Sequence, residues 1–171
     1  MTYEFTLVLD HEPTESELQA FVVAGLDDVG IEGGHGVTLA HFERDAATLA
    51  EAILTAVRQL EAVGVEPTAV ASDDLVSLKD IASRTGRTYE SVRLLAQGNR
   101  GPGGFPPPLS GSGWSLYSWA QVSRWFAQHY GTERAASSYD REIAAADHLV
   151  RARRMLAGDE HRAELAKLLS A

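Results

Sequence analysis

Residues 77–97 are SLKDIASRTGRTYESVRLLAQ, and this stretch decides the fold of the middle of the chain. A helix is predicted to begin after Ser77, because Ser77 and Asp80 have the spacing of a capping box. Gly86 suits the positive φ of a tight turn, and Thr88 is a good N-cap for a second helix. The apolar residues that the two helices turn inward are Leu78, Ile81, Ala82, Val92 and Leu95. The spacing predicts a helix-turn-helix.

The segment after the second helix has the composition of a wing. Residues 101–108, GPGGFPPP, cannot be helical because proline and glycine break helices. Residues 109–117, LSGSGWSLY, predict a two-strand hairpin with a Gly-Ser-Gly tip. Ser118 is a cap for a further helix, which is expected to pack back on the pair through Val122, Trp125 and Phe126. Tryptophans here are more typical of a core than of base stacking.

A family resemblance follows from these residues. From Asp74 to about Tyr130, the runs LVSLKDIASRTGRTYESVR, GFPPP and LYSWAQVSRWF resemble the MerR/excisionase-like winged helix-turn-helix domains. The layout of the whole chain is also similar to that of actinobacterial helix-turn-helix DNA-binding proteins. The resemblance implies that helix 88–97 enters the major groove and that the wing, about 105–117, touches the backbone or the minor groove. It does not specify the DNA sequence that is bound.

Candidate DNA contacts lie on the outward face of the second helix. Arg93 suits a bidentate pair with guanine, Gln97 a pair with adenine, and Glu90 a cytosine amino group. Tyr89 suits a phosphate or a thymine methyl group, whereas arginines near the helix ends suit phosphates. The alternative for each is a solvated surface residue. The complete set of expected DNA-binding residues is Arg87, Thr88, Tyr89, Glu90, Arg93, Gln97, Arg100 and Ser112.

Residues 1–72 predict an α+β domain. The expected elements, in chain order, are a strand at 3–9, a helix at 14–25, a hairpin around 33–36, a helix at 46–64 and an extended piece at 65–72. This β-α-β-β-α-β order resembles the ferredoxin-like arrangement, an antiparallel sheet with both helices on one face.

The last segment, 131–171, predicts two helices. Tyr139, Ile143, Ala146 and Val150 recur at helical spacing, which indicates an apolar stripe. The stripe suits either a dimer interface or packing on the chain's own first segment. The fold class expected is therefore α+β, with a ferredoxin-like domain at 1–72, a winged helix-turn-helix domain at 73–130 and C-terminal helices at 131–171.

Charge is distributed unevenly along the chain, whose formal net charge is −9. Residues 1–72 hold thirteen Asp or Glu and two Arg, whereas residues 73–130 hold four acids and six bases. The acidity therefore belongs to the first segment, and the middle segment remains compatible with DNA. Its positive surface is thin, so a single copy is expected to bind DNA weakly. A dimer on a symmetric site would raise the affinity, because two copies together contact more phosphates.

Other function classes lack sequence support. There is no cysteine, which excludes disulfides and thiolate metal sites. No apolar run is long enough for a membrane span, and the N-terminus lacks the pattern of a secretion signal, so a cytoplasmic protein is expected. No phosphate loop, zinc-protease motif or nucleophile elbow occurs, and the six histidines are scattered. We expect no enzyme activity, no cofactor and no metal.

Three functional hypotheses remain open. The first is a sequence-specific transcriptional regulator that binds double-stranded DNA as a homodimer, with a ligand or protein partner at the acidic segment. The second is an antitoxin-like autorepressor whose acidic segment binds a basic protein, because DAATLAEAILTAVRQLE at 45–61 resembles HicB-type antitoxins. The third is an excisionase-like recombination factor that bends DNA.

Overall fold

The computed structural model describes residues 1–34, 36–110, 115–131 and 138–169. The chain divides into two compact units. The first comprises residues 1–71 together with 145–171, and the second comprises residues 72–144. The C-terminal residues therefore belong mainly to the first unit, whereas the sequence suggested a separate segment from 131 onward.

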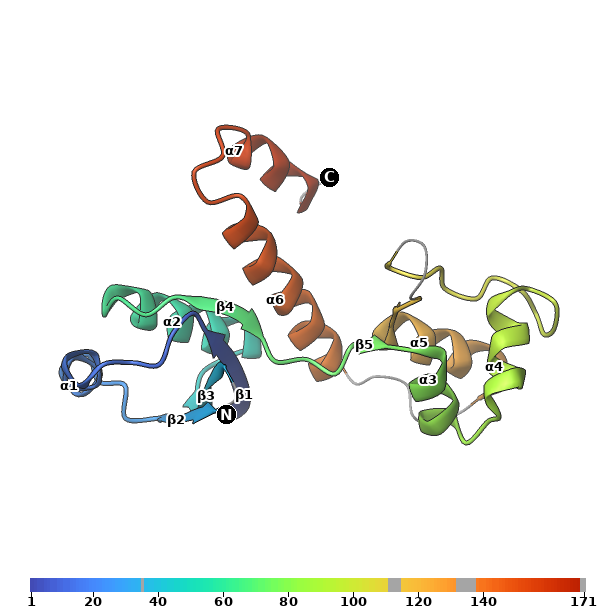
Figure 1. The fold of residues 1–171 in the computed structure, drawn as a ribbon, viewed down its shortest axis with the longest axis horizontal. Helices are drawn as coiled ribbons and strands as arrows, with labels where there is room; N and C mark the ends of the chain where they lie inside the picture. Colours follow the sequence, from blue (N-terminus) through green and yellow to red (C-terminus); the bar gives the residue numbers. More distant parts are fainter. Residues whose placement is uncertain (35, 111–114, 132–137, 170–171) are drawn as a thin grey trace. The chain divides into compact units, whose positions relative to one another are not determined.

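The first unit contains a four-stranded antiparallel sheet. Its strands have the spatial order β2-β3-β1-β4, and every neighbouring pair is antiparallel. Figure 1 shows these elements, which in chain order are β1 (Thr2–Leu9), α1 (Glu15–Val23), β2 (Val29–Gly34), β3 (Val37–Asp45), α2 (Leu49–Ala62) and β4 (Pro67–Val70). The α+β class and the predicted order of elements are confirmed.

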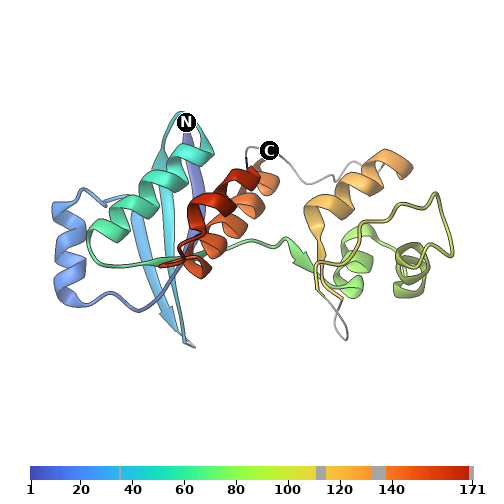
Figure 2. The same ribbon diagram turned by 90° about the horizontal axis from the view of Figure 1, so that it is seen from above.

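The core of the first unit lies between the sheet and α2, which runs across one face of it (Figure 2). Alternate residues of β1 and β3 face this core, and Phe5 stacks on Phe42 with ring centroids 5.1 Å apart. Helix α2 begins because Thr48 accepts a hydrogen bond from the Glu51 amide. The apolar positions of the sequence predict a stripe of Leu49, Ile53, Val57, Leu60 and Val63, of which the first four are buried, together with Ala52 and Ala56, whereas Val63 is half-buried at the end of the helix.

Helix α1 is weakly anchored compared with α2. Thr14 and Glu17 form a reciprocal capping box at its start, and Gly25, with a φ of 71°, follows its end. Phe21 is its one buried residue, whereas Val22 and Val23 are 79% and 90% exposed. The predicted limits of this helix, from Thr14 to Gly25, are therefore confirmed, although its apolar side is mostly exposed.

Helix α6 (Ser138–Met155) contacts the first segment of its own chain. The buried Asp147 carboxylate accepts a hydrogen bond from the Val70 amide of β4 at 3.0 Å and from Arg151 Nε at 2.9 Å. Arg153 forms an ion pair with Glu61 of α2. Packing on the chain's own first segment, one of the two alternatives for this helix, is thus observed. The helix α7 (Arg162–Leu165) and the 3-10 turn η1 (Ala166–Leu169) follow it.

The second unit holds three helices around one apolar core. Its elements are β5 (Leu75–Val76), α3 (Leu78–Thr85), α4 (Tyr89–Ala96), β6 (Tyr117–Ser118) and α5 (Trp119–Tyr130). Most of the residues expected from the sequence are in the buried core, and Leu78, also expected there, is only partly buried against it. The core residues are Ile81, Ala82, Val92, Leu95, Val122, Trp125 and Phe126, together with Val76 and Tyr117.

The predicted wing differs from the observed structure. Residues 101–110 contain no strand, and β6 pairs instead with β5, with Val76 opposite Tyr117. Tyr117 pairs with Val76 instead of with the first half of the predicted hairpin, and the three prolines at 106–108, which lack amide hydrogens, prevent a ladder from extending before Leu109. One backbone hydrogen bond closes the predicted hairpin, from the Leu109 amide to the Leu116 carbonyl at 2.7 Å. The Gly-Ser-Gly tip lies outside the described residues.

Within the described ranges, no helix combines the length and the apolar character that crossing a membrane requires.

Candidate nucleic-acid interface

The corner between α3 and α4 has the local geometry that the sequence predicts. Ser77 and Asp80 form a reciprocal capping box at the start of α3. Gly86 adopts a left-handed conformation with a φ of 65°, and Thr88 accepts a hydrogen bond from the Ser91 amide to start α4. The Arg87 amide donates to the Ala82 carbonyl at 3.0 Å and closes the turn. Each half of the corner is therefore fixed by hydrogen bonds to the backbone.

Helix α4 has one buried and one exposed side. Val92 and Leu95 are almost completely buried in the core of the second unit. Tyr89 stands at the start of the helix and is 51% exposed, while Thr88, Glu90 and Gln97 are also exposed. The outward face is therefore accessible at both ends of the helix, and Arg93 between them is half-exposed.

Three of the expected base-contacting residues form one hydrogen-bonded group on this face. Arg93 donates to both carboxylate oxygens of Glu90, from Nε at 2.8 Å and from Nη2 at 2.6 Å. Its Nη1 donates to Gln97 Oε1 at 2.9 Å. The structure thus brings together Arg93, Glu90 and Gln97, which the sequence analysis selected one by one.

The pairing changes the acid–base properties of both charged groups. The hydrogen bonds from Arg93 lower the pKa of Glu90, because they stabilise its charged form. The same contact raises the pKa of Arg93. Both groups are therefore charged at neutral pH, and their charges offset each other on the helix surface. Any partner that takes the Arg93 donors must compete with the Glu90 carboxylate.

Arg87 packs on the aromatic rings of α5. Its guanidinium carbon lies 4.3 Å from the centroid of the Tyr130 ring and 5.2 Å from that of Phe126. These distances define cation–π contacts, which hold the side chain half-buried. Arg84 lies over the Trp119 ring in the same way, at 5.1 Å. A phosphate contact by Arg87 stays a prediction, and the structure adds a role in tying the corner to α5.

The segment after α4 is anchored by aromatic contacts. Trp125 Nε1 donates to the Gly103 carbonyl at 3.0 Å, and the Phe105 ring packs edge-on against Trp125 at 5.0 Å. Arg100 is exposed next to this loop, as a phosphate-binding side chain must be. Ser112, the expected contact of the wing, lies outside the described residues.

Asp74 caps a helix of this unit, a structural role that no sequence pattern indicates. Its Oδ1 accepts a hydrogen bond from the Ala120 amide at 2.6 Å, and its carbonyl accepts one from the Trp119 amide at 2.7 Å. Asp74 therefore joins Ser118 in capping α5. Local sequence patterns could not reveal this contact, because its two partners are 46 residues apart.

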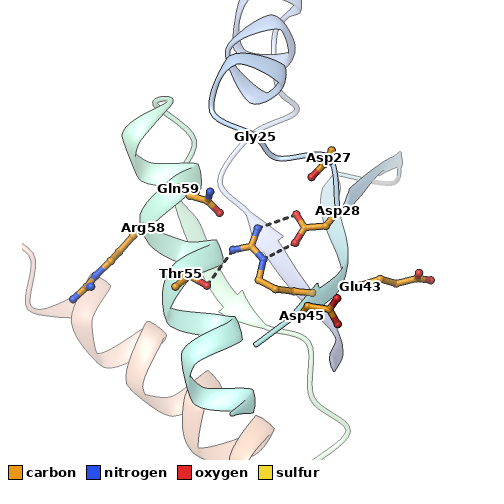
Figure 3. A pocket seen from close by; sticks show the side chains of 9 residues that line it. Gly25, Asp27, Asp28, Glu43, Asp45, Thr55, Arg58 and Gln59 are labelled. Atoms are coloured by element: carbon orange, nitrogen blue, oxygen red, sulfur yellow. Dashed lines mark hydrogen bonds and ion pairs between the residues drawn. The ribbon is translucent and has the colours of Figure 1, made fainter. Parts of the chain in front are cut away.

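The first unit has a separate candidate site, a pocket of about 600 Å³ shown in Figure 3. Arg44, which is only 7% exposed, lies at its centre and donates to both carboxylate oxygens of Asp28, at 2.6 and 2.8 Å. Its Nη1 donates to Thr55 Oγ1 at 3.2 Å. The other residues that line the pocket are Gly25, Asp27, Glu43, Asp45, Arg58 and Gln59. The lining therefore holds four carboxylates and two guanidinium groups, with Asp28 paired to Arg44.

No group of three His, Asp or Glu side chains with metal-binding geometry occurs in the part of the chain that the structure describes. No protein-family model matches the chain, and comparisons with curated proteins and with solved structures gave no significant match.

Proposed function

We propose that this chain is a sequence-specific double-stranded DNA-binding protein that acts as a transcriptional regulator. In this proposal, residues 74–130 form a winged helix-turn-helix domain, and α4 enters the major groove. The strand order β2-β3-β1-β4 supports a ferredoxin-like arrangement for the first unit, which serves as the accessory domain.

One observation carries the proposal. The α3–α4 corner turns through a left-handed Gly86, its inner side is buried, and its outer side carries an accessible group of base-contacting residue types. Arginine, glutamine and glutamate on one exposed helix are typical of a helix that contacts base edges.

The contacts proposed for DNA follow from the side-chain chemistry. Arg93 donates to guanine O6 and N7, Gln97 pairs with adenine, and Glu90 accepts from a cytosine amino group. To make the guanine contact, Arg93 exchanges part of its hydrogen bonding to Glu90 for the base. Arg100 and the amides at the start of α4 hold phosphates, which positions the helix without selecting a sequence.

The charge of the second unit limits the affinity of a single copy. Residues 72–144 hold seven acids and eight bases, so few phosphate contacts are available. Tight binding therefore requires two copies on a two-fold symmetric site, about one turn of duplex apart.

A selection of binding sequences from random duplexes tests the proposal. Wild-type protein is expected to enrich a symmetric motif, and Arg93→Ala is expected to lose enrichment at one position per half-site. Lys79→Ala, a change of another exposed cation in the same unit, is the matched control and should keep the motif. Absence of any motif for the wild-type protein at low salt would refute the proposal.

A further inference from the structure

The two edge strands of the four-stranded sheet differ in whether another element contacts their outward backbone groups. At the β4 edge, the outward amide of Val70 donates to Asp147 of α6, so a helix satisfies this edge. At the opposite edge, β2 pairs only with β3. An uncovered strand edge presents unpaired amide and carbonyl groups, which is a template for another strand.

The outward groups of β2 can be identified from its register. The Glu43 amide donates to the Asp28 carbonyl, which makes these two residues a hydrogen-bonded pair of the ladder. Because such pairs alternate, the backbone groups of Val29, Ile31 and Gly33 point away from β3. Among the described residues, none forms a backbone hydrogen bond to these outward groups. The outward backbone groups of these three alternate residues are therefore open to strand addition.

Acidic side chains surround this edge. Asp27 and Asp28 precede β2, Glu32 lies within it, and the Glu12 carboxylate approaches Gly33, 3.2 Å from where a Cβ atom would stand. Glu32 is largely exposed and bonds to His41 at 3.0 Å. Four carboxylates therefore lie along the strand edge, of which Asp28 is paired with Arg44 and Glu32 bonds to His41.

The pocket lies at the first end of the same edge. Asp27 and Asp28 line it, and Arg44 inside it is already paired with Asp28 and Thr55 (Figure 3). Arg58 projects away from Asp28 (Figure 3). A strand added to β2 and continued past Val29 brings every second side chain to this side of the sheet. A lysine or arginine in the added strand, just beyond the residue opposite Val29, would lie close to Asp27, which lines the pocket.

We infer that the β2 edge binds an extended basic segment of another protein by strand addition, with one basic side chain at the Asp27 pocket. Charge decides between this partner and a second copy of the chain. Pairing β2 with itself sets two acidic edges against each other, within segments that each carry thirteen acids and two arginines. A basic strand instead gains both backbone hydrogen bonds and charge complementarity.

The test uses the full-length protein and three synthetic ten-residue peptides. The first alternates Lys and Val, the second replaces each Lys with Glu, and the third is the Lys/Val peptide with alternate backbone amides methylated. Calorimetry should show the Lys/Val peptide binding at least about tenfold more tightly than the other two, because methylation removes several hydrogen bonds. Hydrogen exchange should slow at the Val29, Ile31 and Gly33 amides.

Protein variants supply the second comparison. Ile31→Pro removes the outward amide of Ile31 without removing a hydrogen bond between β2 and β3. Ile31→Ala also removes most of the isoleucine side chain but keeps the amide, so it controls for the loss of the side chain. Only the proline variant should lose binding, and Asp27→Asn should weaken it several-fold. If the methylated peptide bound as tightly as the unmethylated Lys/Val peptide, the inference would be overturned. This comparison uses only the wild-type protein, so it does not depend on whether a variant folds. A dimer in sedimentation that Ile31→Pro dissociates would also overturn it, because a second copy would then occupy the edge.

Discussion

Substitution of Asp147 by alanine tests how the C-terminal helix is held on the first unit. The Asp147 side chain is 6% exposed, and its Oδ1 accepts hydrogen bonds from both the Val70 amide and Arg151. Alanine removes the acceptor and leaves the Val70 amide buried without a partner. Val70 itself is completely buried, so water cannot replace the carboxylate without local opening.

The expected loss follows from the unsatisfied amide. A buried donor without a partner costs about 1–3 kcal/mol, so we expect the free energy of unfolding to fall by about 2 kcal/mol. For a unit of this size, the midpoint of thermal unfolding then falls by roughly 10 °C. Circular dichroism measures the midpoint, and hydrogen exchange should accelerate at the Val70 amide specifically.

Asp147→Asn is the matched control. Its carbonyl oxygen still accepts from the Val70 amide, while the ion pair with Arg151 is lost. The Arg151 side chain is 54% exposed, so this ion pair contributes little, less than about 1 kcal/mol. If asparagine destabilised the protein as much as alanine did, the hydrogen bond to β4 would not be what holds α6, and the reasoning would be refuted.

Three further predictions concern the second unit. Glu90→Gln should tighten binding to duplexes that lack the selected motif by about two- to fivefold, because it removes a negative charge and frees Arg93; weaker binding to such duplexes in electrophoretic mobility shifts would contradict this. Gly101→Ala should lower the free energy of unfolding of the unit by about 2 kcal/mol in chemical denaturation, because φ is 82° and the new Cβ would lie 2.6 Å from Leu95 Cδ2. Gly98→Ala, the control, has free space around the new Cβ and should lower the free energy of unfolding by less. The capping hydrogen bonds from Ser77 lower the pKa of Asp80 below its ordinary 3.8, so this stabilisation is complete above pH 3.8 and is lost as pH falls through the folded-state pKa. Asp80→Asn should therefore flatten the acid limb of the stability profile, and an unchanged limb would exclude the contribution.

Local signals explain what the sequence could predict. The capping box at Ser77, the left-handed Gly86 and the cap at Thr88 each depend on residues within one turn of chain, so the α3–α4 corner was predictable in detail. The alternation in β1 and the stripe of α2 likewise place core residues on a single face. Such periodic patterns can be recognised in the sequence, because they involve residues only a few positions apart.

Contacts between distant residues account for what the sequence could not predict. Val76 pairs with Tyr117, and Asp74 caps a helix 46 residues later. No sequence pattern marks Asp147 as buried, because a carboxylate on a helix is normally solvated. Its partner is an amide of an edge strand, which no local pattern identifies. The stacking of Arg87 on the rings of α5 belongs to the same class of contact.

In the proposed function, α4 selects a DNA sequence through Arg93. The most direct test is to select sequences from random duplexes at low and at physiological salt, with wild-type protein and with Arg93→Ala. We predict a two-fold symmetric motif for the wild type, and an affinity for that motif that falls roughly tenfold to a hundredfold in the variant, with the preference at one position per half-site relaxed. A wild-type protein that enriches no sequence at either salt, or a variant that enriches the unchanged motif with unchanged affinity, would contradict this prediction.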